Sequence, residues 1–326
     1  MNSSRFYSTG LEEELEAVRK IIIESITSRI TAVSNPLKQL VSAKSKLLRP
    51  AFLILSSKFG NYDTSVVYPL AASIEMLHTA SLIHDDIIDR ASTRRGQSSL
   101  HKIIGAGQSV LMGDYLLSKG YSLILHRLDK ENQLLLANII SHLCESEIAE
   151  SSSVYMTDVT EREYIRRIAG KTASLFALSC HVGASESGCS QEYTSALRRC
   201  GYCTGMAFQI IDDILDFRSS TAVLGKPAGN DLKEGTFTLP VLHAIKTGGI
   251  RFKNELVKIN KKKGFLKDRQ VIKVIRMTEN LGGIDFAITT AELYTKRALR
   301  EIMKLPEGNN RNNLSELVQT LLLRKY

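Results

Sequence analysis

Two copies of one short acidic pattern, Asp-Asp-x-x-Asp, are the residues of this chain best suited to chemistry. The first and last aspartates of each copy are four residues apart, so on an α-helix both leave the same face, about 6 Å apart along the axis. Such carboxylates repel one another unless a cation binds. Magnesium is suitable, because it takes one or two carboxylates and completes its coordination with water and phosphate oxygens. The predicted metal-binding residues are Asp85, Asp86, Asp89, Asp212, Asp213 and Asp216.

Basic side chains near both copies could receive the diphosphate groups of a substrate. Arginine binds phosphate in a bidentate manner, whereas lysine acts as a point charge. Each of these residues alone is more often a plain surface charge. Together with the carboxylates they predict a site for two diphosphates, one bound through metal and one on basic side chains. The basic residues concerned are Lys46, Arg49, Arg94, Arg95, Lys171, Lys226 and Lys233.

Two strongly apolar helices, predicted over residues 66–88 and 190–218, must position the aspartates, and each pattern closes its helix. We expect the two acidic helix ends to face each other across one cavity. Apolar residues recur at helical spacing along most of the chain, and no alternating strand pattern competes. Further helices are expected over residues 11–30, 105–128, 131–155, 160–183, 236–247, 266–281, 284–304 and 314–326. The expected fold is all-α, a single large helical bundle around a central cavity, formed as one domain by residues 1–326 with residues 1–10 flexible.

The composition is that of a soluble globular chain with an excess of basic residues. It has 326 residues, 43% of them hydrophobic, and a formal net charge of +9. No uncharged apolar run approaches the roughly 18 residues of a membrane span, and no apolar signal region begins the chain. The positive charge favours phosphorylated substrates or an anionic membrane surface. Nucleic acid is not an expected partner, because no nucleic-acid-binding motif is present and aromatic residues are few.

The five cysteines show no disulfide pattern, which predicts reduced thiols and a cytoplasmic protein. Cys200 and Cys203 form an isolated CxxC, interpreted as a buried pair on a helix rather than a zinc or redox site. A basic segment over residues 251–269 contains three consecutive lysines, Lys261 to Lys263. We interpret this segment as a solvated turn, with a membrane-facing patch as the alternative.

In order and spacing these residues resemble the trans-isoprenyl diphosphate synthase (polyprenyl synthetase) family, long-chain type, over residues 46–240. The resemblance implies an isoprenoid synthase-like fold, three magnesium ions per active site and a homodimer. It implies an enzyme that adds isopentenyl diphosphate in trans configuration to an allylic diphosphate such as farnesyl or geranyl diphosphate. The motifs that carry it are Lys46-Leu47-Leu48-Arg49-Pro50, residues 75–84 before the first aspartate pattern, Arg94-Arg95-Gly96, Gly113-Asp114-Tyr115, Gly170-Lys171-Thr172-Ala173, Phe208-Gln209 before the second pattern, Gly225-Lys226-Pro227, and Gly235 with Thr238-Leu239-Pro240.

The resemblance also implies a role for each site residue. Magnesium would be bound by Asp85, Asp89 and Asp212, with Asp86, Asp213 and Asp216 in support. The allylic diphosphate would be bound by Arg94, Lys171 and Lys226, and isopentenyl diphosphate by Lys46, Arg49, His78 and Arg95. Thr172 and Gln209 would lie beside the allylic cation, and with Lys171 they are the predicted catalytic residues.

Three positions depart from the family pattern. Lys44-Ser45 stands where the family usually has two glycines, and Leu47 where it often has arginine. Thr236 stands where many shorter-chain members have a lysine that contacts the allylic diphosphate. These changes concern the tightness of substrate binding rather than the carboxylates that carry the chemistry.

The expected reaction is ionisation, condensation and elimination. Magnesium and basic side chains stabilise the charge that develops on the departing diphosphate. The isopentenyl double bond then attacks the allylic cation, and a proton is lost, with the released diphosphate as the base that the resemblance implies. Apolar walls exclude water, which would otherwise quench the cation.

The helix before the first aspartate pattern is predicted to set product length through Leu77, Ala80 and Ser81. Ala80 and Ser81 are small, whereas short-chain members have an aromatic plug there. The helix from Val66 to Asp85 is about 28 Å long and an isoprene unit matches about one turn, so we expect a product of about C30 to C45. The family's usual use for such lengths is quinone side chains. Because the product is so apolar, its release is expected to need a peripheral membrane contact or a partner.

Three other functions compete with this prediction. A class I terpene cyclase usually replaces the second aspartate pattern, whereas this chain keeps all three aspartates. A regulatory subunit of a hetero-oligomeric prenyltransferase usually loses one pattern, but a catalytic subunit that is inactive without a small partner would keep both and stays open. A helical scaffold without activity is disfavoured, because two matched metal motifs seldom arise from packing alone.

Overall fold

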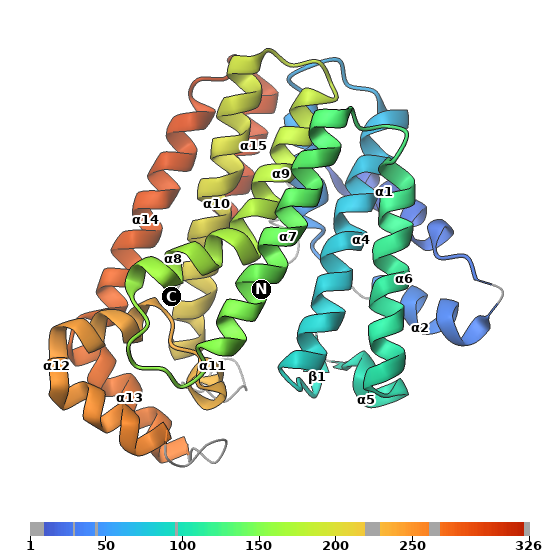
Figure 1. The fold of residues 1–326 in the computed structure, drawn as a ribbon. Helices are drawn as coiled ribbons and strands as arrows, with labels where there is room; N and C mark the ends of the chain where they lie inside the picture. Colours follow the sequence, from blue (N-terminus) through green and yellow to red (C-terminus); the bar gives the residue numbers. More distant parts are fainter. Residues whose placement is uncertain are drawn as a thin grey trace. The chain divides into compact units, whose positions relative to one another are not determined.

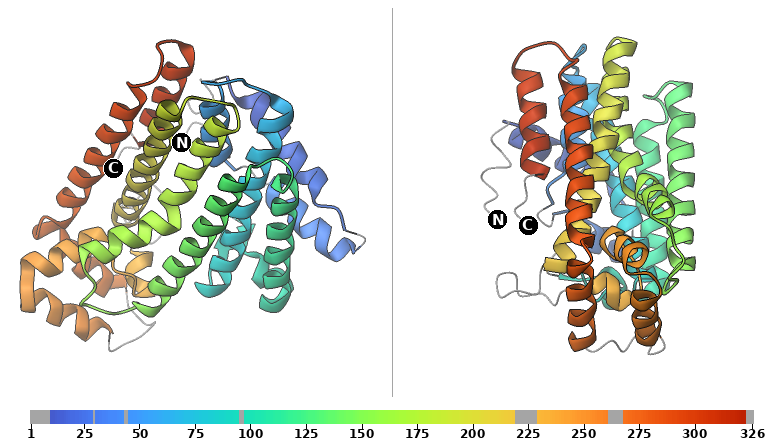
Figure 2. Two further views of the ribbon diagram at one scale, coloured as in Figure 1. Left: turned by 45° about the horizontal axis from the view of Figure 1, so that its top comes forward. Right: turned by 90° about the vertical axis from the view of Figure 1, so that its left-hand side faces the viewer.

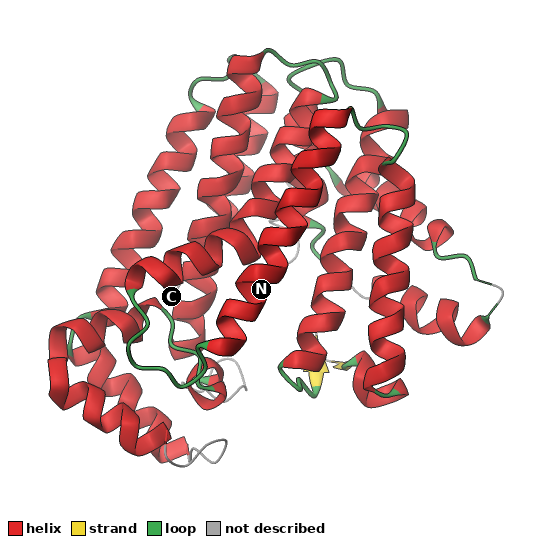
Figure 3. Ribbon diagram, viewed as in Figure 1, coloured by secondary structure: helices red, strands yellow, loops and turns green. Residues whose placement is uncertain are grey.

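The computed structural model describes residues 10–28, 30–42, 45–94, 97–218, 229–260 and 268–322. Within these ranges helices joined by loops make up the structure apart from two short antiparallel strands, β1 (Thr93–Arg94) and β2 (Gln97–Ser98), as Figure 3 shows. The all-α prediction is therefore confirmed.

Packing divides the chain into two compact units, which we describe separately. Unit 1 comprises residues 1–136, 178–198 and 304–314, and unit 2 comprises residues 137–177, 199–303 and 315–326. Residues of both units occur in α7 (Lys130–Ser152), α9 (Ser174–Ser185), α10 (Gln191–Arg218) and α15 (Asn309–Leu322). The prediction of a single domain stays a prediction.

Unit 1 is built around the long helix α4 (Thr64–Ile88), which packs against α1, α3 and α6. Figures 1 and 2 show α4 and α6 lying side by side along their lengths. Length and composition alone would let α4 cross a membrane, but 67% of its apolar window is buried inside the structure, as in the core helix of a globular protein. The other elements of this unit are α1 (Glu12–Ser25), α2 (Thr31–Ser42), α3 (Leu48–Ser57), the two strands, α5 (Leu100–Ile104) and α6 (Ala106–Ile124).

Unit 2 contains α8 (Glu161–Ile168), the π-helix η2 (Ala169–Ala173), α11 (Asn230–Glu234), α12 (Leu239–Asn260), α13 (Asp268–Asn280) and α14 (Gly283–Ile302). A reciprocal capping box between Thr160 and Glu163 begins α8 and satisfies backbone N–H groups of its first turn. Helices α12, α13 and α14, orange to red in Figure 1, pack against one another, and α12 also contacts α8.

Most predicted helices are confirmed with small shifts at their ends. The helices that carry the aspartates, predicted over 66–88 and 190–218, are α4 and α10. The segment predicted as one helix over 160–183 consists of α8, η2 and α9. Helices α2 and α3 were not predicted: α2 contains Pro36, and α3 has only ten residues, fewer than the roughly 11 to 18 over which helical periodicity is judged.

Candidate active site

The first aspartate pattern lies at the C-terminal end of α4 in unit 1. Asp89 caps this helix, and its backbone N–H donates to the carbonyl of Asp85 at 2.8 Å. Residues three, four and seven apart share one helix face, so His78, Ser81, Asp85 and Asp89 form one row, here called the aspartate stripe. Asp85 and His78 are half-buried and Asp89 is exposed. Two predicted metal ligands and one predicted isopentenyl diphosphate contact therefore share a face.

Asp86 lies on another face of α4 and pairs with Arg94 on β1. Its buried Oδ1 accepts from Nε of Arg94 at 2.8 Å and from Nη2 at 2.5 Å. Removing one partner from such a buried pair is costly, because the other charge is left without compensation. Asp86 thus fixes the turn after α4 and holds Arg94 beside the aspartates. Its supporting role toward a metal stays a prediction.

Helix α6 holds the end of α4 through His84, the residue before Asp85. Nε2 of His84 lies 3.3 Å from Oδ1 of Asp114 and 3.3 Å from the carbonyl oxygen of Val110. A Cβ atom at Gly113 would lie 2.3 Å from the same nitrogen, so a glycine is required for this approach. The Gly113-Asp114 motif therefore positions the aspartate-bearing end of α4.

The predicted chain-length residues fall on two faces of α4. One face meets α6: Ser73 Oγ donates to the carbonyl of Gly120 at 2.8 Å, and Leu77 packs against the same glycine. Ala80, three residues after Leu77, belongs to this face and is 0% exposed. Ser81 instead belongs to the aspartate stripe and is half-buried. Ala80 and Ser81, which were both predicted to set product length, therefore lie on different faces of α4.

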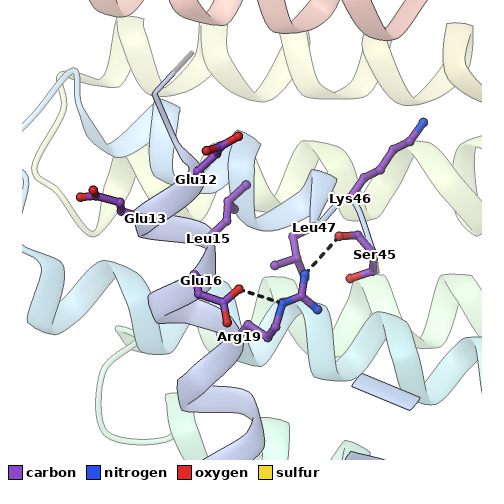
Figure 4. A pocket seen from close by; sticks show the side chains of 8 residues that line it. All are labelled: Glu12, Glu13, Leu15, Glu16, Arg19, Ser45, Lys46 and Leu47. Carbon is purple, nitrogen blue, oxygen red and sulfur yellow. Dashed lines mark hydrogen bonds and ion pairs between the residues drawn. The ribbon is translucent and has the colours of Figure 1, made fainter. Parts of the chain in front are cut away.

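Arg19 on α1 anchors the segment that leads to Lys46 and Arg49. Its Nη1 donates to the carbonyl of Val41 at 2.8 Å, and its Nη2 to the carbonyl of Ser45 at 3.2 Å. Figure 4 shows this guanidinium reaching from α1 to the segment, where it also pairs with a glutamate of its own helix. These bonds fix the path of the chain directly before two predicted isopentenyl diphosphate contacts.

Leu47, one of the three departures from the family pattern, packs inside unit 1. It caps α3 with a φ of 45°, a left-handed value that is uncommon for non-glycine residues and often marks functional segments. Its side chain and that of Arg49 are buried. A pocket of about 380 Å³ lies beside this segment, lined by residues of α1 and by Ser45, Lys46 and Leu47 (Figure 4).

The second aspartate pattern lies near the C-terminal end of α10 in unit 2. Asp216 holds the segment that follows, because its two carboxylate oxygens accept the backbone N–H groups of Asn230 at 3.1 Å and Asp231 at 3.2 Å. Its carbonyl also accepts from the N–H of Gly229 at 3.0 Å. Asp212 is half-buried and lies four residues before Asp216, on the same helix face.

Asp213 is the centre of a buried row of hydrogen bonds, here called the Asp213 chain. Tyr164 Oη donates to Oδ2 of Asp213 at 2.6 Å, and Gln209 Nε2 donates to Oδ1 at 2.8 Å. Thr172 Oγ1 in turn donates to Oε1 of Gln209 at 2.7 Å. The Asp213 chain therefore joins two predicted catalytic residues to the second aspartate pattern. Tyr164 was not identified from the sequence, where nothing distinguishes it from other tyrosines.

Burial raises the pKa of three carboxyl groups in this part of unit 2. Desolvation raises the pKa of Asp213 to about 7, although its hydrogen bonds act in the opposite direction. Desolvation also raises the pKa of Asp216, and the pKa of Asp231 lies well above its usual value because of burial and the charges of Asp213 and Asp216. Asp231 was not identified from the sequence. A bound cation would relieve the mutual repulsion of these carboxylates.

Lys171 lies on the π-helix η2, next to Thr172. π-Helical turns are rare, and those that occur are often found at functional sites. A Cβ atom at Gly170 would lie 2.0 Å from Ser146 Oγ, so η2 runs very close to α7. Nζ of Lys171 pairs with two carboxylates of that helix. This pairing could not be predicted from a local sequence pattern, because the partners are 21 and 24 residues away.

The described carboxylates suit magnesium chemically without forming a complete cage. No group of three or more His, Cys, Asp or Glu side chains in the described ranges is arranged to hold a metal ion. Magnesium needs only one or two carboxylates when phosphate oxygens and water complete its shell. Asp85, Asp89 and Asp212 retain exposed surface for such binding. The donor set therefore fits magnesium that is bound together with a diphosphate.

Some predicted residues lie outside the described part of the chain, namely Arg95, Lys226, Lys44 and Lys261 to Lys263. Thr236 is half-buried, and its N–H donates to the carbonyl of Asp231 at 2.8 Å. Cys200 and Cys203 are buried, and none of the five cysteines, all of which the structure describes, forms a disulfide. The two aspartate patterns belong to different units, so their expected sharing of one cavity stays a prediction.

Comparison with known proteins decides the family. The family described as "Polyprenyl synthetase" matches residues 30–278. The chain belongs to this family. It is therefore a prenyltransferase, which confirms the resemblance seen in its motifs.

Relatives within the polyprenyl synthetase family match nearly the whole chain. Heptaprenyl diphosphate synthase component 2 of Bacillus subtilis is 34% identical over 316 residues, which cover 97% of this chain and 89% of the relative. The all-trans-nonaprenyl-diphosphate synthase (geranyl-diphosphate specific) of Rhodobacter capsulatus is 35% identical over 317 residues, 96% of this chain and 95% of the relative. The crystal structure of heptaprenyl diphosphate synthase from Staphylococcus aureus has a TM-score of 0.91 at 31% identity, covering 97% of this chain and 99% of that one.

Proposed function

We propose that this polyprenyl synthetase condenses isopentenyl diphosphate with an allylic diphosphate, in trans configuration, to make a long-chain polyprenyl diphosphate. The observation that carries the proposal is the Asp213 chain, which joins Thr172 and Gln209 to the second aspartate pattern. A diphosphate held at that pattern would depart from the allylic carbon as the carbon–oxygen bond breaks, and the positive charge left on the allylic group would develop beside two polar side chains. Preorganised polar groups of this kind stabilise a charged transition state without reorganisation.

The predicted residues that the structure describes divide between the two substrates of this reaction. Magnesium, when bound by Asp85, Asp89 and Asp212, would neutralise charge on the departing diphosphate. Arg94 and Lys171 would bind the same group, because both cations lie beside an aspartate pattern or its hydrogen-bonded partners. The oxygens of Thr172 and Gln209 would stabilise the allylic cation.

The second substrate would be held by the other basic residues. Lys46, Arg49 and His78 would bind the isopentenyl diphosphate and aim its double bond at the allylic carbon. The new carbon–carbon bond forms, the allylic carbon–oxygen bond having broken, and a proton leaves the former isopentenyl unit for the released diphosphate. The apolar residues of α4 would line the path of the growing chain and exclude water.

The product is proposed to be about C30 to C45 long, from the length of α4 and its small residues before the aspartates. The names of the two relatives give seven and nine prenyl units, which lie inside that range. Quinone side chains are the proposed use of the product.

The decisive experiment incubates the purified chain with magnesium, labelled isopentenyl diphosphate and a series of allylic primers, then sizes the products. We expect a ladder that ends in the proposed range and disappears in EDTA. Cyclic hydrocarbons would indicate a terpene cyclase instead. A product that stops at three or four prenyl units would contradict the long-chain proposal.

A second candidate is favoured by one observation: the Bacillus subtilis relative is named as a component 2. In that case the chain is the catalytic subunit of a hetero-oligomer and inactive alone. Activity of the purified chain would exclude this function. Activity that appears only after extract from the source organism is added, and that copurifies with a second polypeptide, would support it.

The assembly and location are also proposals. We propose a cytoplasmic homodimer with three magnesium ions per active site and a peripheral membrane contact during product release. The five cysteines, none of which forms a disulfide, fit a reducing compartment. Light scattering after gel filtration tests the dimer, and cosedimentation with anionic vesicles, with and without product, tests the membrane contact.

A further inference from the structure

The ammonium group of Lys171 forms ion pairs with two carboxylates on α7. Its Nζ lies 3.0 Å from Glu147 Oε2 and 2.6 Å from Glu150 Oε2. Helical spacing of three residues places both glutamates on one face of α7, toward η2. The carboxylates are mostly buried, at 13% and 20% exposure, whereas Lys171 retains 28%. The lysine is thus fixed by the protein and still accessible to a ligand.

Glu150 is itself held from its other side. Its Oε1 lies 3.7 Å from Nε of Arg167, a buried side chain whose Nη2 donates to the carbonyl of Phe237 at 3.3 Å. Two acids and two bases therefore balance, so the cluster of Glu147, Glu150, Arg167 and Lys171 has no net charge. A balanced and hydrogen-bonded cluster can be partly buried without strongly disfavouring its ions.

We propose that Glu147 and Glu150 are positioning residues that hold Lys171 where the allylic diphosphate binds. This inference rests on the proposed function, in which Lys171 stabilises the departing diphosphate. A free lysine side chain samples many rotamers, and each must be given up when the ammonium meets a phosphate. The two glutamates hold Lys171 in one rotamer before the substrate binds. Such preorganisation of a charged group is what makes electrostatic stabilisation of a transition state strong.

The placement of Lys171 on η2 agrees with a positioning role. The next residue, Thr172, enters the Asp213 chain through its hydroxyl. Fixing Lys171 and Thr172 on one short π-helical turn fixes the diphosphate contact and the cation contact relative to each other. Without this shared turn, the distance between the diphosphate contact and the cation contact would depend on two side chains that move independently.

The test uses Glu147→Gln, Glu150→Gln and the double variant, since glutamine keeps the shape and removes the charge. The double variant is expected to lose about 10-fold or more in kcat/KM for the allylic diphosphate, as when a group that orients a functional residue is removed. The KM for isopentenyl diphosphate is expected to stay unchanged, because other residues bind it. General damage to the fold would change both.

A double-mutant cycle with Lys171→Met shows whether the glutamates act through the lysine. In the Lys171→Met background the glutamine substitutions are expected to have no further effect on kcat/KM. An equal loss in both backgrounds, or no loss with Lys171 present, would overturn the proposal. If Lys171→Met itself is fully active, the role of Lys171 in the proposed function fails instead, so the two failures are distinguishable.

The matched control is Glu255→Gln in the same unit. Glu255 is 25% exposed and bridges two lysines, Lys258 at 2.9 Å and Lys273 at 2.6 Å, far along the chain from Lys171. Its substitution is expected to leave both KM values unchanged. Thermal melts of all variants show whether each remains folded at the assay temperature.

Discussion

At the level of single residues, Asp213 is a predicted metal ligand whose carboxylate is already engaged by other side chains of the protein. Both of its carboxylate oxygens accept hydrogen bonds, one from Tyr164 and one from Gln209. Asp212 and Asp216, on the neighbouring face, are only half-buried. Asp213 therefore holds Tyr164 and Gln209 in place. Its role as a metal ligand stays a prediction, as does that of Asp216, whose two carboxylate oxygens accept backbone N–H groups.

Replacement of this aspartate should change how stability depends on pH. Burial raises the pKa of Asp213 from 3.8 to about 7, so the folded protein binds this proton more tightly than the unfolded chain. The contribution of Asp213 to stability is then most favourable below about pH 4 and declines as pH rises through about 7. In EDTA, the Tm of Asp213→Asn is expected to exceed that of the wild type at pH 8, and the difference should shrink toward pH 5.

Thermal melts over that pH range measure the effect. Asp158→Asn, a substitution at an exposed aspartate of the same unit, is the control and should parallel the wild type. An Asp213→Asn variant whose Tm also parallels the wild type at every pH would contradict the raised pKa.

Sequence reasoning identified the aspartates because their pattern repeats, but it could not identify their partners. Glu150 and Lys171 are 21 residues apart, and Tyr164 and Asp213 are 49 apart. No local pattern joins such pairs, because only the packing of helices brings them together. Asp231 escaped notice for the same reason: its pKa is raised first by burial and then by the charges of Asp213 and Asp216, which are far from it in the sequence, with Glu234 contributing less.

At the scale of the element, the two faces of α4 predict different outcomes for two neighbouring substitutions. Ser81→Phe places an aromatic ring on the aspartate stripe and is expected to shorten the product. Ala80→Phe places the ring on the face that meets α6, where overpacking typically costs about 1–3 kcal/mol. Product sizing and thermal melts of both variants separate the effects. If Ser81→Phe leaves product length unchanged, the growing chain does not pass along the aspartate stripe.

The contact of η2 with α7 gives a prediction about Gly170. Gly170→Ala would place a methyl group 2.0 Å from Ser146 Oγ, so this hydroxyl must rotate away, and the carbonyl of His142 at 3.1 Å would still press on η2 beside Lys171. We expect the unfolding free energy to fall by about 1–3 kcal/mol. We also expect kcat/KM to fall at temperatures where the variant remains folded.

Adding Ser146→Gly removes the atom that the new methyl group meets. The pair Gly170→Ala and Ser146→Gly is therefore expected to recover activity relative to Gly170→Ala alone. No recovery would show that the backbone conformation of residue 170, rather than its contact with α7, limits the variant.

The elements themselves were partly predictable. Periodicity identified α4 and α10 because each has a polar end and a long apolar body. It missed α3 because ten residues are fewer than the roughly 11 to 18 over which helical periodicity can be judged. It also merged α8, η2 and α9, since a single π-helical turn alters the pattern too briefly to be seen in apolar spacing.

At the scale of the whole molecule, four helices contain residues of both compact units. Breaking such a helix at the boundary between units would forfeit backbone hydrogen bonds in both. We therefore expect one cooperative unfolding transition, as the prediction of a single domain requires. Differential scanning calorimetry should give a van't Hoff enthalpy equal to the calorimetric enthalpy. Two resolved transitions, each shifted by substitutions in only one unit, would contradict that prediction.

The π-helix has a consequence for anyone who compares this chain with others residue by residue. One turn of η2 contains an additional residue relative to an α-helix, so the faces of α9 are offset by about 100° from a wheel drawn through α8. Deleting one residue between Ala169 and Ala173 would restore an uninterrupted α-helix and turn every later side chain of α9 away from its present neighbours. Chimaeras that exchange this region must therefore preserve its residue count, even where the amino acids differ.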